Sequence, residues 1–262
     1  MMKIKKSILI LFFIVINLTM LAETPIEIIN KSRDVIKLNG VEMIISLITK
    51  DRNNNVRKQK IASISKLYSD NTEKKIMRFL YPTDVKGTGF LSYDYEKKDD
   101  LMWLYLPSLR KSRKIAASER SKSFMGSEFS YSDITSFKIE DFKYSILGEE
   151  NINGEKCWKL EQKSKNDDIA DDYGFFKKIV YISKRNYMVM KTESYDEDDE
   201  LCKVMEALGI KKIDVKRNRY RATHLIIKNL DNGRSSEMII EKIKLRENIK
   251  DSYFTTRFLE RN

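Results

Sequence analysis

Residues 101–106, Leu-Met-Trp-Leu-Tyr-Leu, are the stretch that decides the fold class. No polar residue separates the apolar ones, so a strand built from them is apolar on both faces. Such a strand is covered on both sides, because apolar surface left in water costs free energy. A helix would supply one cover. The other cover is left open between a second protein layer, a lid or partner, and a bound apolar ligand, and only the ligand would point to a lipid carrier.

On either side of this stretch, short apolar runs alternate with charged residues and are divided by turn signals. Trp158 and Leu160 alternate with the charged residues at 159, 161 and 163, which is typical of a half-buried strand. Runs at 179–182 and 187–190 flank Ser-Lys-Arg-Asn, and runs at 220–230 and 235–245 flank Asp-Asn-Gly, so each pair predicts a β-hairpin. Many strands joined by short turns predict a mainly β protein with an antiparallel sheet, open or curled into a barrel.

One helix is predicted over residues 24–36. Thr24 suits the N-cap, Pro25 suits the first helical position, and Glu27 completes a T-x-x-E capping box. The chain has only three prolines, and neither a Pro/Gly/Ser-rich linker nor an internal repeat stands out. We therefore expect residues 23–262 to form a single domain.

The first 22 residues follow the three-part pattern of an export signal. Three lysines in the first six residues precede an apolar run at 7–18, and Leu21-Ala22 then precedes Glu23. The run is shorter than the roughly 20 residues that span a membrane. We expect a signal peptide over residues 1–22 and a soluble periplasmic protein, with an uncleaved anchor as the alternative. No cysteine lies near the cut, so lipid attachment as a bacterial lipoprotein is not expected.

The charge balance is basic, but it does not indicate a nucleic-acid partner. The chain has 50 Lys and Arg against 39 Asp and Glu. Residues 1–22 contribute three of the lysines, so 47 basic and 39 acidic residues remain, a net charge of +8. Lysine, asparagine and isoleucine are abundant throughout, which is typical of a background composition. Export also argues against nucleic acid as a partner.

Cysteine and histidine usage limits the chemistry that the chain can perform. Cys157 and Cys202 are candidates for one disulfide in an oxidising compartment, although the sequence alone does not place them within bridging distance. His224 is the single histidine, which argues against a His-based triad or a multi-His zinc site. Acidic runs at 167–172 and 196–200 lack the spacing of a calcium loop and are expected to be solvated loops. We expect no metal, no cofactor and no enzymatic activity.

The region from Leu101 to Ile134 combines aromatic and basic residues in a way that suggests a ligand site. An aromatic strand leads directly into Arg110, Lys111, Arg113 and Lys114, and an aromatic–glycine segment follows a Ser-rich loop. Guanidinium groups match phosphate bidentately, so the basic residues could receive lipid head groups or an acidic partner surface. A solvated strand face is the competing interpretation. The candidate cavity or head-group residues are Trp103, Tyr105, Leu106, Arg110, Arg113, Phe124, Met125, Phe129 and Tyr131.

Three segments carry a resemblance to a known family. They are residues 82–91 (Pro-Thr-Asp-Val-Lys-Gly-Thr-Gly-Phe-Leu), residues 103–107 with their basic tail, and residues 124–133 (Phe-Met-Gly-Ser-Glu-Phe-Ser-Tyr-Ser-Asp). In residue identity, order and spacing, these segments resemble the sequences of the outer-membrane lipoprotein-sorting protein family, whose members are similar to LolA. Glu128 stands where that family usually has aspartate. The resemblance implies an incomplete, half-barrel antiparallel sheet, helices covering its concave side, and a hydrophobic cavity that holds acyl chains.

Two functions follow from these observations. The first is a periplasmic carrier that binds lipid or an acylated lipoprotein and moves it towards the outer membrane. The alternative is a non-enzymatic adaptor that docks on an exporter of the resistance–nodulation–division type or on an envelope assembly. An inner-membrane exporter or an outer-membrane acceptor would then be the protein partner.

Overall fold

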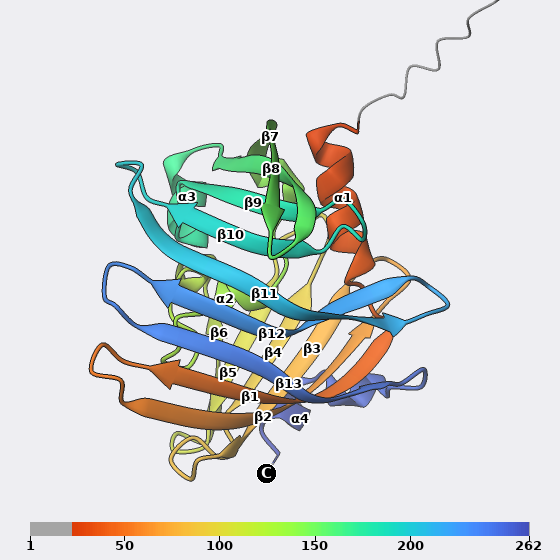
Figure 1. The fold of residues 1–262 in the computed structure, drawn as a ribbon. Helices are drawn as coiled ribbons and strands as arrows, with labels where there is room; N and C mark the ends of the chain where they lie inside the picture. The colour runs from red at the N-terminus through yellow and green to blue at the C-terminus, as the bar shows by residue number, and fades with distance from the viewer. Residues whose placement is uncertain (1–22, 262) are drawn as a thin grey trace, which may run out of the picture.

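The computed structural model describes residues 23–261, so the predicted export signal at residues 1–22 lies outside the described residues. The main element is one antiparallel sheet of 13 strands (Figure 1). Within the described range, no helix has the length and apolar character needed to cross a membrane. The strands are β1 Gly40–Lys50, β2 Val56–Leu67, β3 Glu73–Tyr81, β4 Gly89–Asp94, β5 Leu101–Leu106, β6 Lys111–Ile115, β7 Phe142–Ile152, β8 Glu155–Ser164, β9 Lys177–Ser183, β10 Val189–Tyr195, β11 Leu201–Asp214, β12 Arg219–Asn229 and β13 Ser235–Leu245.

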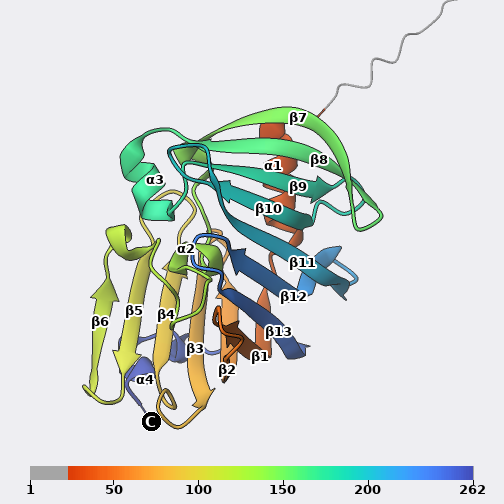
Figure 2. The ribbon, with the colours of Figure 1, turned by 60° about the vertical axis from the view of Figure 1, so that its left-hand side comes forward.

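The strand order shows how the chain closes on itself. Strands β1 to β6 run outwards in one direction, and β7 to β13 return from the other edge. The two series meet where β1 pairs with β13, with Val41 opposite Leu245. The sheet curves without closing into a barrel, and its free edges are β6 and β7 (Figure 2). The prediction of a mainly β protein with an open, curved antiparallel sheet is confirmed.

The helix and the hairpin turn that local sequence signals predict are present in the structure, but one predicted loop is a helix. Helix α1 (Pro25–Val35) begins with the predicted capping box between Thr24 and Glu27. Gly233, in the β12–β13 turn, has a φ of 68°, a conformation that glycine adopts without steric cost. The expected acidic loop at 167–172 is instead helix α3 (Asp167–Tyr173), because Asn166 accepts a hydrogen bond from Ile169 N and early aspartates suit a helix N-terminus.

Both covers of β5 are protein. Met102 and Leu104 face the concave side and join the largest apolar cluster. Tyr105 faces the opposite side, where Phe254 and Leu259 cover it. These two residues belong to the C-terminal segment that contains α4 (Thr256–Leu259). The two-sided apolar pattern therefore marks a strand between two protein layers and does not require a ligand.

The concave side is divided between a packed half and an open half. In the packed half, the segment around Phe124–Tyr131 lies on β3 to β5 and also contacts Ile227 of β12. In the other half, Ile28 and Ile29 of α1 pack against Leu160 and Val180. Helices therefore lie over the concave side, as the resemblance implied. The short helix α2 (Tyr131–Ile134) lies between the halves (Figures 1 and 2).

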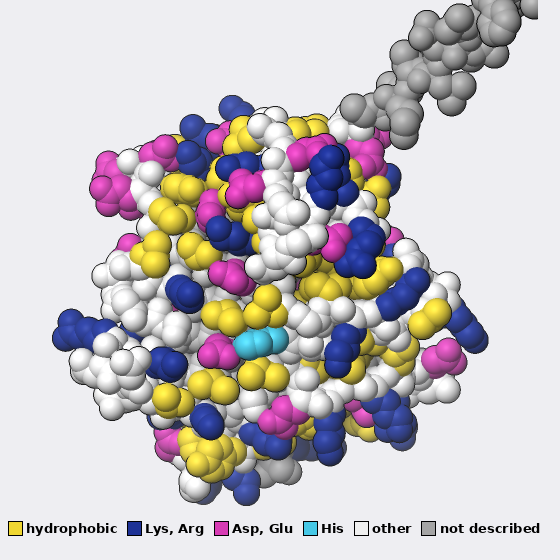
Figure 3. Space-filling model, viewed as in Figure 1, with side chains coloured by type: hydrophobic (Ala, Val, Ile, Leu, Met, Phe, Trp, Pro, Cys, Tyr) yellow, Lys and Arg dark blue, Asp and Glu magenta, His cyan; other side chains and the backbone are white. Residues whose placement is uncertain are grey.

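The convex face of β11 to β13 carries a mixed surface. Figure 3 shows hydrophobic side chains interspersed with basic and acidic ones on this face. His224 of β12 lies here, with its Nε2 2.8 Å from Glu237 Oε2 on β13. The positive charge is not gathered into one patch on the face in view, in keeping with a background excess of lysine.

Candidate functional site

A cavity of about 290 Å³ lies between helix α1 and strands β8 to β12, in the open half of the concave side. We call it the apolar chamber, because most of its lining side chains are apolar. Its size is at the lower end of the range for small-molecule sites. The chamber is lined by Ile29, Ser32, Arg33, Ile36, Ser132, Asp133, Thr135, Phe137, Gln162, Tyr173, Phe175, Lys178, Val180, Met188, Val189, Thr192, Met205, Ala207, Arg221, Ala222 and Leu225.

A second cavity of about 300 Å³ adjoins the first, and we call it the polar chamber. It extends from the end of α1 over β3 and β4, and many of its lining residues are charged or polar: Lys37, Asn71, Glu73, Lys75, Asp94, Glu96 and Ser136. Seven residues line both chambers and form what we call the junction: Arg33, Ile36, Asp133, Thr135, Phe137, Arg221 and Leu225. A ligand could therefore place an apolar part and a polar part in adjoining spaces.

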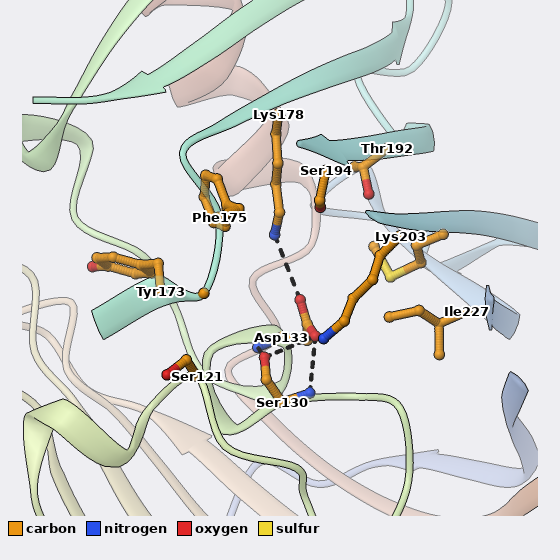
Figure 4. A pocket seen from close by; sticks show the side chains of 12 residues that line it. Ser121, Ser130, Asp133, Tyr173, Phe175, Lys178, Thr192, Ser194, Lys203 and Ile227 are labelled. Carbon is orange, nitrogen blue, oxygen red and sulfur yellow. Dashed lines mark hydrogen bonds and ion pairs between the residues drawn. The ribbon is translucent and has the colours of Figure 1, made fainter. Parts of the chain in front are cut away.

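Asp133 is fixed at the junction by Ser130 in its own segment and by Lys178 of a neighbouring strand. It accepts hydrogen bonds from Ser130 N at 2.9 Å and Ser130 Oγ at 2.8 Å. Its other oxygen lies 3.5 Å from Lys178 Nζ of β9. Figure 4 shows Lys178 and Lys203 pointing towards Asp133. Burial alone would raise the pKa of Asp133, but Lys178 and Ser130 lower it, so the carboxylate is charged and its charge is balanced internally.

A cluster of charged residues lines the polar chamber. Burial raises the pKa of Asp94 to about 7, with the neighbouring Glu73 adding to the effect and Lys75 opposing it. Glu73 differs, because Lys75 and Arg221 outweigh burial and lower its pKa. Burial lowers the pKa of the Arg221 guanidinium, and Glu73 counteracts this. These carboxyl groups therefore favour different protonation states within one chamber.

The aromatic residues predicted for the site are part of the core. Phe124, Phe129 and Tyr131 are buried, and the Phe124 ring lies 5.9 Å from Phe79 and 5.6 Å from Phe90 between ring centroids. They line neither chamber. Their function in the fold is to fill the packed half of the concave side, which confines the open space to the region under α1.

The predicted residues of β5 are also outside both chambers. Leu106 packs against the concave core, while Trp103 and Tyr105 lie on the opposite face, in the cluster that includes Phe254 and Leu259. The C-terminal segment is fixed there by Tyr93, whose hydroxyl donates to the Phe254 carbonyl oxygen. Trp103 and Tyr105 are therefore covered by the chain's own C-terminal segment.

The basic residues lie at the surface near edge strand β6, whereas Met125 lies beside the β12–β13 turn, where its neighbour Gly126 accepts a hydrogen bond from Arg234. Arg110 is exposed in the turn after β5. Arg113 pairs with Glu119, at 3.0 Å between Nη1 and Oε2. Met125 has a φ of 53° in a tight turn and packs partly on the concave core. The sequence brought these residues together along the chain, but the structure does not direct them into a shared cavity.

The two cysteines are free thiols and do not form the disulfide that the sequence left open. Cys157 lies on β8 and Cys202 on β11, so β9 and β10 separate them in the sheet. Three strand spacings of about 4.8 Å place their Cα atoms far beyond the distance of about 7 Å that a disulfide can bridge.

The chamber residues gave little signal in the sequence. They come from α1 and its C-cap, the Ser132–Phe137 segment, the end of α3, the β9–β10 turn and five strands, each contributing one to four side chains. Arg33 and Arg221 are two of 50 basic residues and belong to no motif. The helical period of α1 could have placed Ile29, Arg33 and Ile36 on one face, since residues three and four apart are neighbours on a helix.

Several solved structures have a fold similar to that of this chain. The outer membrane lipoprotein-sorting protein domain from Vibrio parahaemolyticus is 26% identical, over 90% of this chain and 98% of that chain, with a TM-score of 0.82. A DUF1329 family protein from Desulfovibrio piger is 23% identical, over 90% and 100%, with a TM-score of 0.81. A LolA superfamily protein from Nitrosomonas europaea is 18% identical, over 90% and 100%, with a TM-score of 0.69.

A family model with the description "Uncharacterized protein" matches residues 71–261. Among curated proteins, none matches the chain. The resemblance to lipoprotein-sorting proteins that the sequence suggested is confirmed at the level of the fold.

Proposed function

We propose a carrier function for this chain, which belongs to the family whose model spans residues 71–261 and has the fold of the lipoprotein-sorting structures. In this proposal the protein is exported, loses residues 1–22, and carries a lipid or an acylated lipoprotein through the periplasm towards the outer membrane. It works by binding and release and catalyses no reaction.

The apolar chamber is the observation that carries the proposal. It remains open although the other half of the concave side is filled by aromatic side chains. Each CH₂ group moved from water into such a space gains about 0.8 kcal/mol. Helix α1 and its C-cap form one wall through Ile29 and Ile36, so a displacement of α1 would uncover the cargo for an acceptor.

Lipid content provides the test. Protein purified from the periplasm should carry co-purified lipid that is detected by native mass spectrometry and by extraction. Ala207→Trp places a bulky side chain into the chamber, since Ala207 is buried and lines it, and should abolish the bound lipid. Val215→Trp is the matched control at an exposed position and should leave it unchanged. Equal lipid content in both variants, or none in the unmodified protein, would refute the proposal.

A second candidate, an adaptor that docks on an exporter, is supported by edge strand β6. One side of β6 has no neighbouring strand, and its exposed residues include Lys111 and Lys114, next to Arg110 and Leu109. Glu260 already accepts a hydrogen bond from Ser112 N of this strand at 3.2 Å, and an acidic partner segment that added to the basic edge would take the place of that contact. Reversing the charges of Arg110, Lys111 and Lys114 to glutamate should abolish capture of such a partner while lipid content stays unchanged. If the charge-reversed variant loses its bound lipid but still captures the partner, the result favours the carrier function over the adaptor function.

A further inference from the structure

Two guanidinium groups at the junction lack acidic partners. Arg33 and Arg221 line both chambers, and neither forms an ion pair with any carboxylate between residues 23 and 261. The Nε atom of Arg221 is buried and has no hydrogen-bond partner. A buried donor without an acceptor costs free energy, so this position favours a ligand that supplies one.

The carboxylates near the junction do not satisfy these donors. Asp133 is already held by Ser130 and Lys178. Glu73 attracts Arg221, but Lys75 acts on the same carboxylate more strongly, and no ion pair between Glu73 and Arg221 forms. The lining of the apolar chamber therefore has three cations, Arg33, Lys178 and Arg221, and a single carboxylate. Its charge is positive although most of its surface is apolar.

From this combination we infer that the cargo is an anionic amphiphile, whose oxyanion head lies at the junction between Arg33 and Arg221 and whose tail fills the apolar chamber. The inference rests on the proposed carrier function and specifies its ligand. Guanidinium groups bind carboxylate and phosphate oxygens through paired, charge-assisted hydrogen bonds. Carboxylate and phosphate share this chemistry, and the experiment below separates them.

Three ligands with the same tail test the inference: palmitate, palmitoyl-lysophosphatidate and the neutral hexadecanol. Each is measured by displacement of the uncharged fluorophore N-phenylnaphthylamine. We expect at least one anion to bind about tenfold or more tightly than hexadecanol, since a hydrogen bond to a charged group contributes about that factor. The anion that binds more tightly identifies the head group as carboxylate or phosphate.

Arginine variants assign the effect to the junction. Arg221→Gln should weaken anion binding about tenfold and leave hexadecanol binding unchanged. Arg33→Gln, on the partly exposed face of α1, should act in the same direction and serves as the second variant if Arg221→Gln does not fold. Arg57→Gln is the control, because Arg57 is exposed and pairs with Asp84 away from both chambers.

The outcomes separate this inference from the carrier function. Equal affinity for hexadecanol and both anions, or equal weakening of all three ligands by Arg221→Gln, would overturn the anionic head group while the carrier function stands. If none of the three ligands displaces the fluorophore, the carrier function itself fails, and the inference fails with it.

Discussion

Lys75 Nζ lies 3.9 Å from an oxygen of Asp94 at the wall of the polar chamber, and it is the cation nearest to that carboxyl group. Neither Asp94 oxygen accepts a hydrogen bond, and only about 2% of the side chain is exposed. One distant cation does not compensate for burial, so the pKa of Asp94 rises to about 7. The polar chamber therefore contains a carboxyl group that titrates near neutral pH.

This titration predicts how stability depends on pH. The unfolded chain releases the Asp94 proton near the ordinary value of 3.8, while the folded protein retains it up to about pH 7. The folded state thus binds more protons in this window, and stability falls as pH rises through it. Asp94→Asn cannot titrate, so its free energy of unfolding relative to the unmodified protein should increase by up to about 4 kcal/mol between roughly pH 4 and pH 8.

Urea unfolding at several pH values measures this difference. Asp84→Asn is the control, because Asp84 is exposed and its removal should shift stability little and without this pH window. Curves for Asp94→Asn and the unmodified protein that stay parallel across the window would show that Asp94 is ionised in the folded state.

The sequence predicted the fold well because its signals are local. The capping box at Thr24, the turn at Gly233 and the two-sided apolar run at 101–106 each depend on residues close in the chain. The site was not predictable in the same way, because the chambers exist only where distant elements fail to fill space. Phe124 looked like a ligand contact for the same reason that it packs well: it is aromatic and close to other aromatic residues.

The C-terminal segment should contribute substantially to stability. Leu259 is fully buried against Gly89, and a Cβ added at Gly89 would lie 2.6 Å from Leu259 Cδ1. Leu259→Ala should cost about 2–4 kcal/mol of unfolding free energy. Leu245→Ala, at a partly exposed leucine, should cost well under half of that.

A double-mutant cycle checks that this contact is the cause. Gly89→Ala should destabilise the unmodified protein by about 1–3 kcal/mol, because the added methyl group meets Leu259. In the Leu259→Ala background the same change should cost clearly less. Additive costs in thermal or urea unfolding would mean that Gly89 and Leu259 are not in contact.

A buried charge cluster should hold the segment that crosses the concave side. Lys138 Nζ lies 2.6 Å from Asp100 Oδ1, and Arg120 lies 3.6 Å from the other oxygen. Removing one member of a buried pair leaves a charge without compensation, so Lys138→Met should cost about 3–5 kcal/mol. Arg57→Met, which breaks the exposed pair with Asp84, should cost no more than about 1 kcal/mol. Similar costs for both variants in urea unfolding would argue against the buried cluster.

The thiols should be present but unreactive in the folded protein. Burial raises the pKa of Cys157 to about 11, with a further contribution from Glu155, and burial also raises the pKa of Cys202. Since the thiolate is the reactive form, alkylation by iodoacetamide at about pH 8 should be slow in the native protein and rapid for both cysteines after denaturation. A Val215→Cys variant gives the matched control, because its exposed thiol should react rapidly in the native state. An intact mass two hydrogens lower, with neither native cysteine alkylated after denaturation, would instead reveal a disulfide and would require β8 and β11 to lie much closer than the strand order allows.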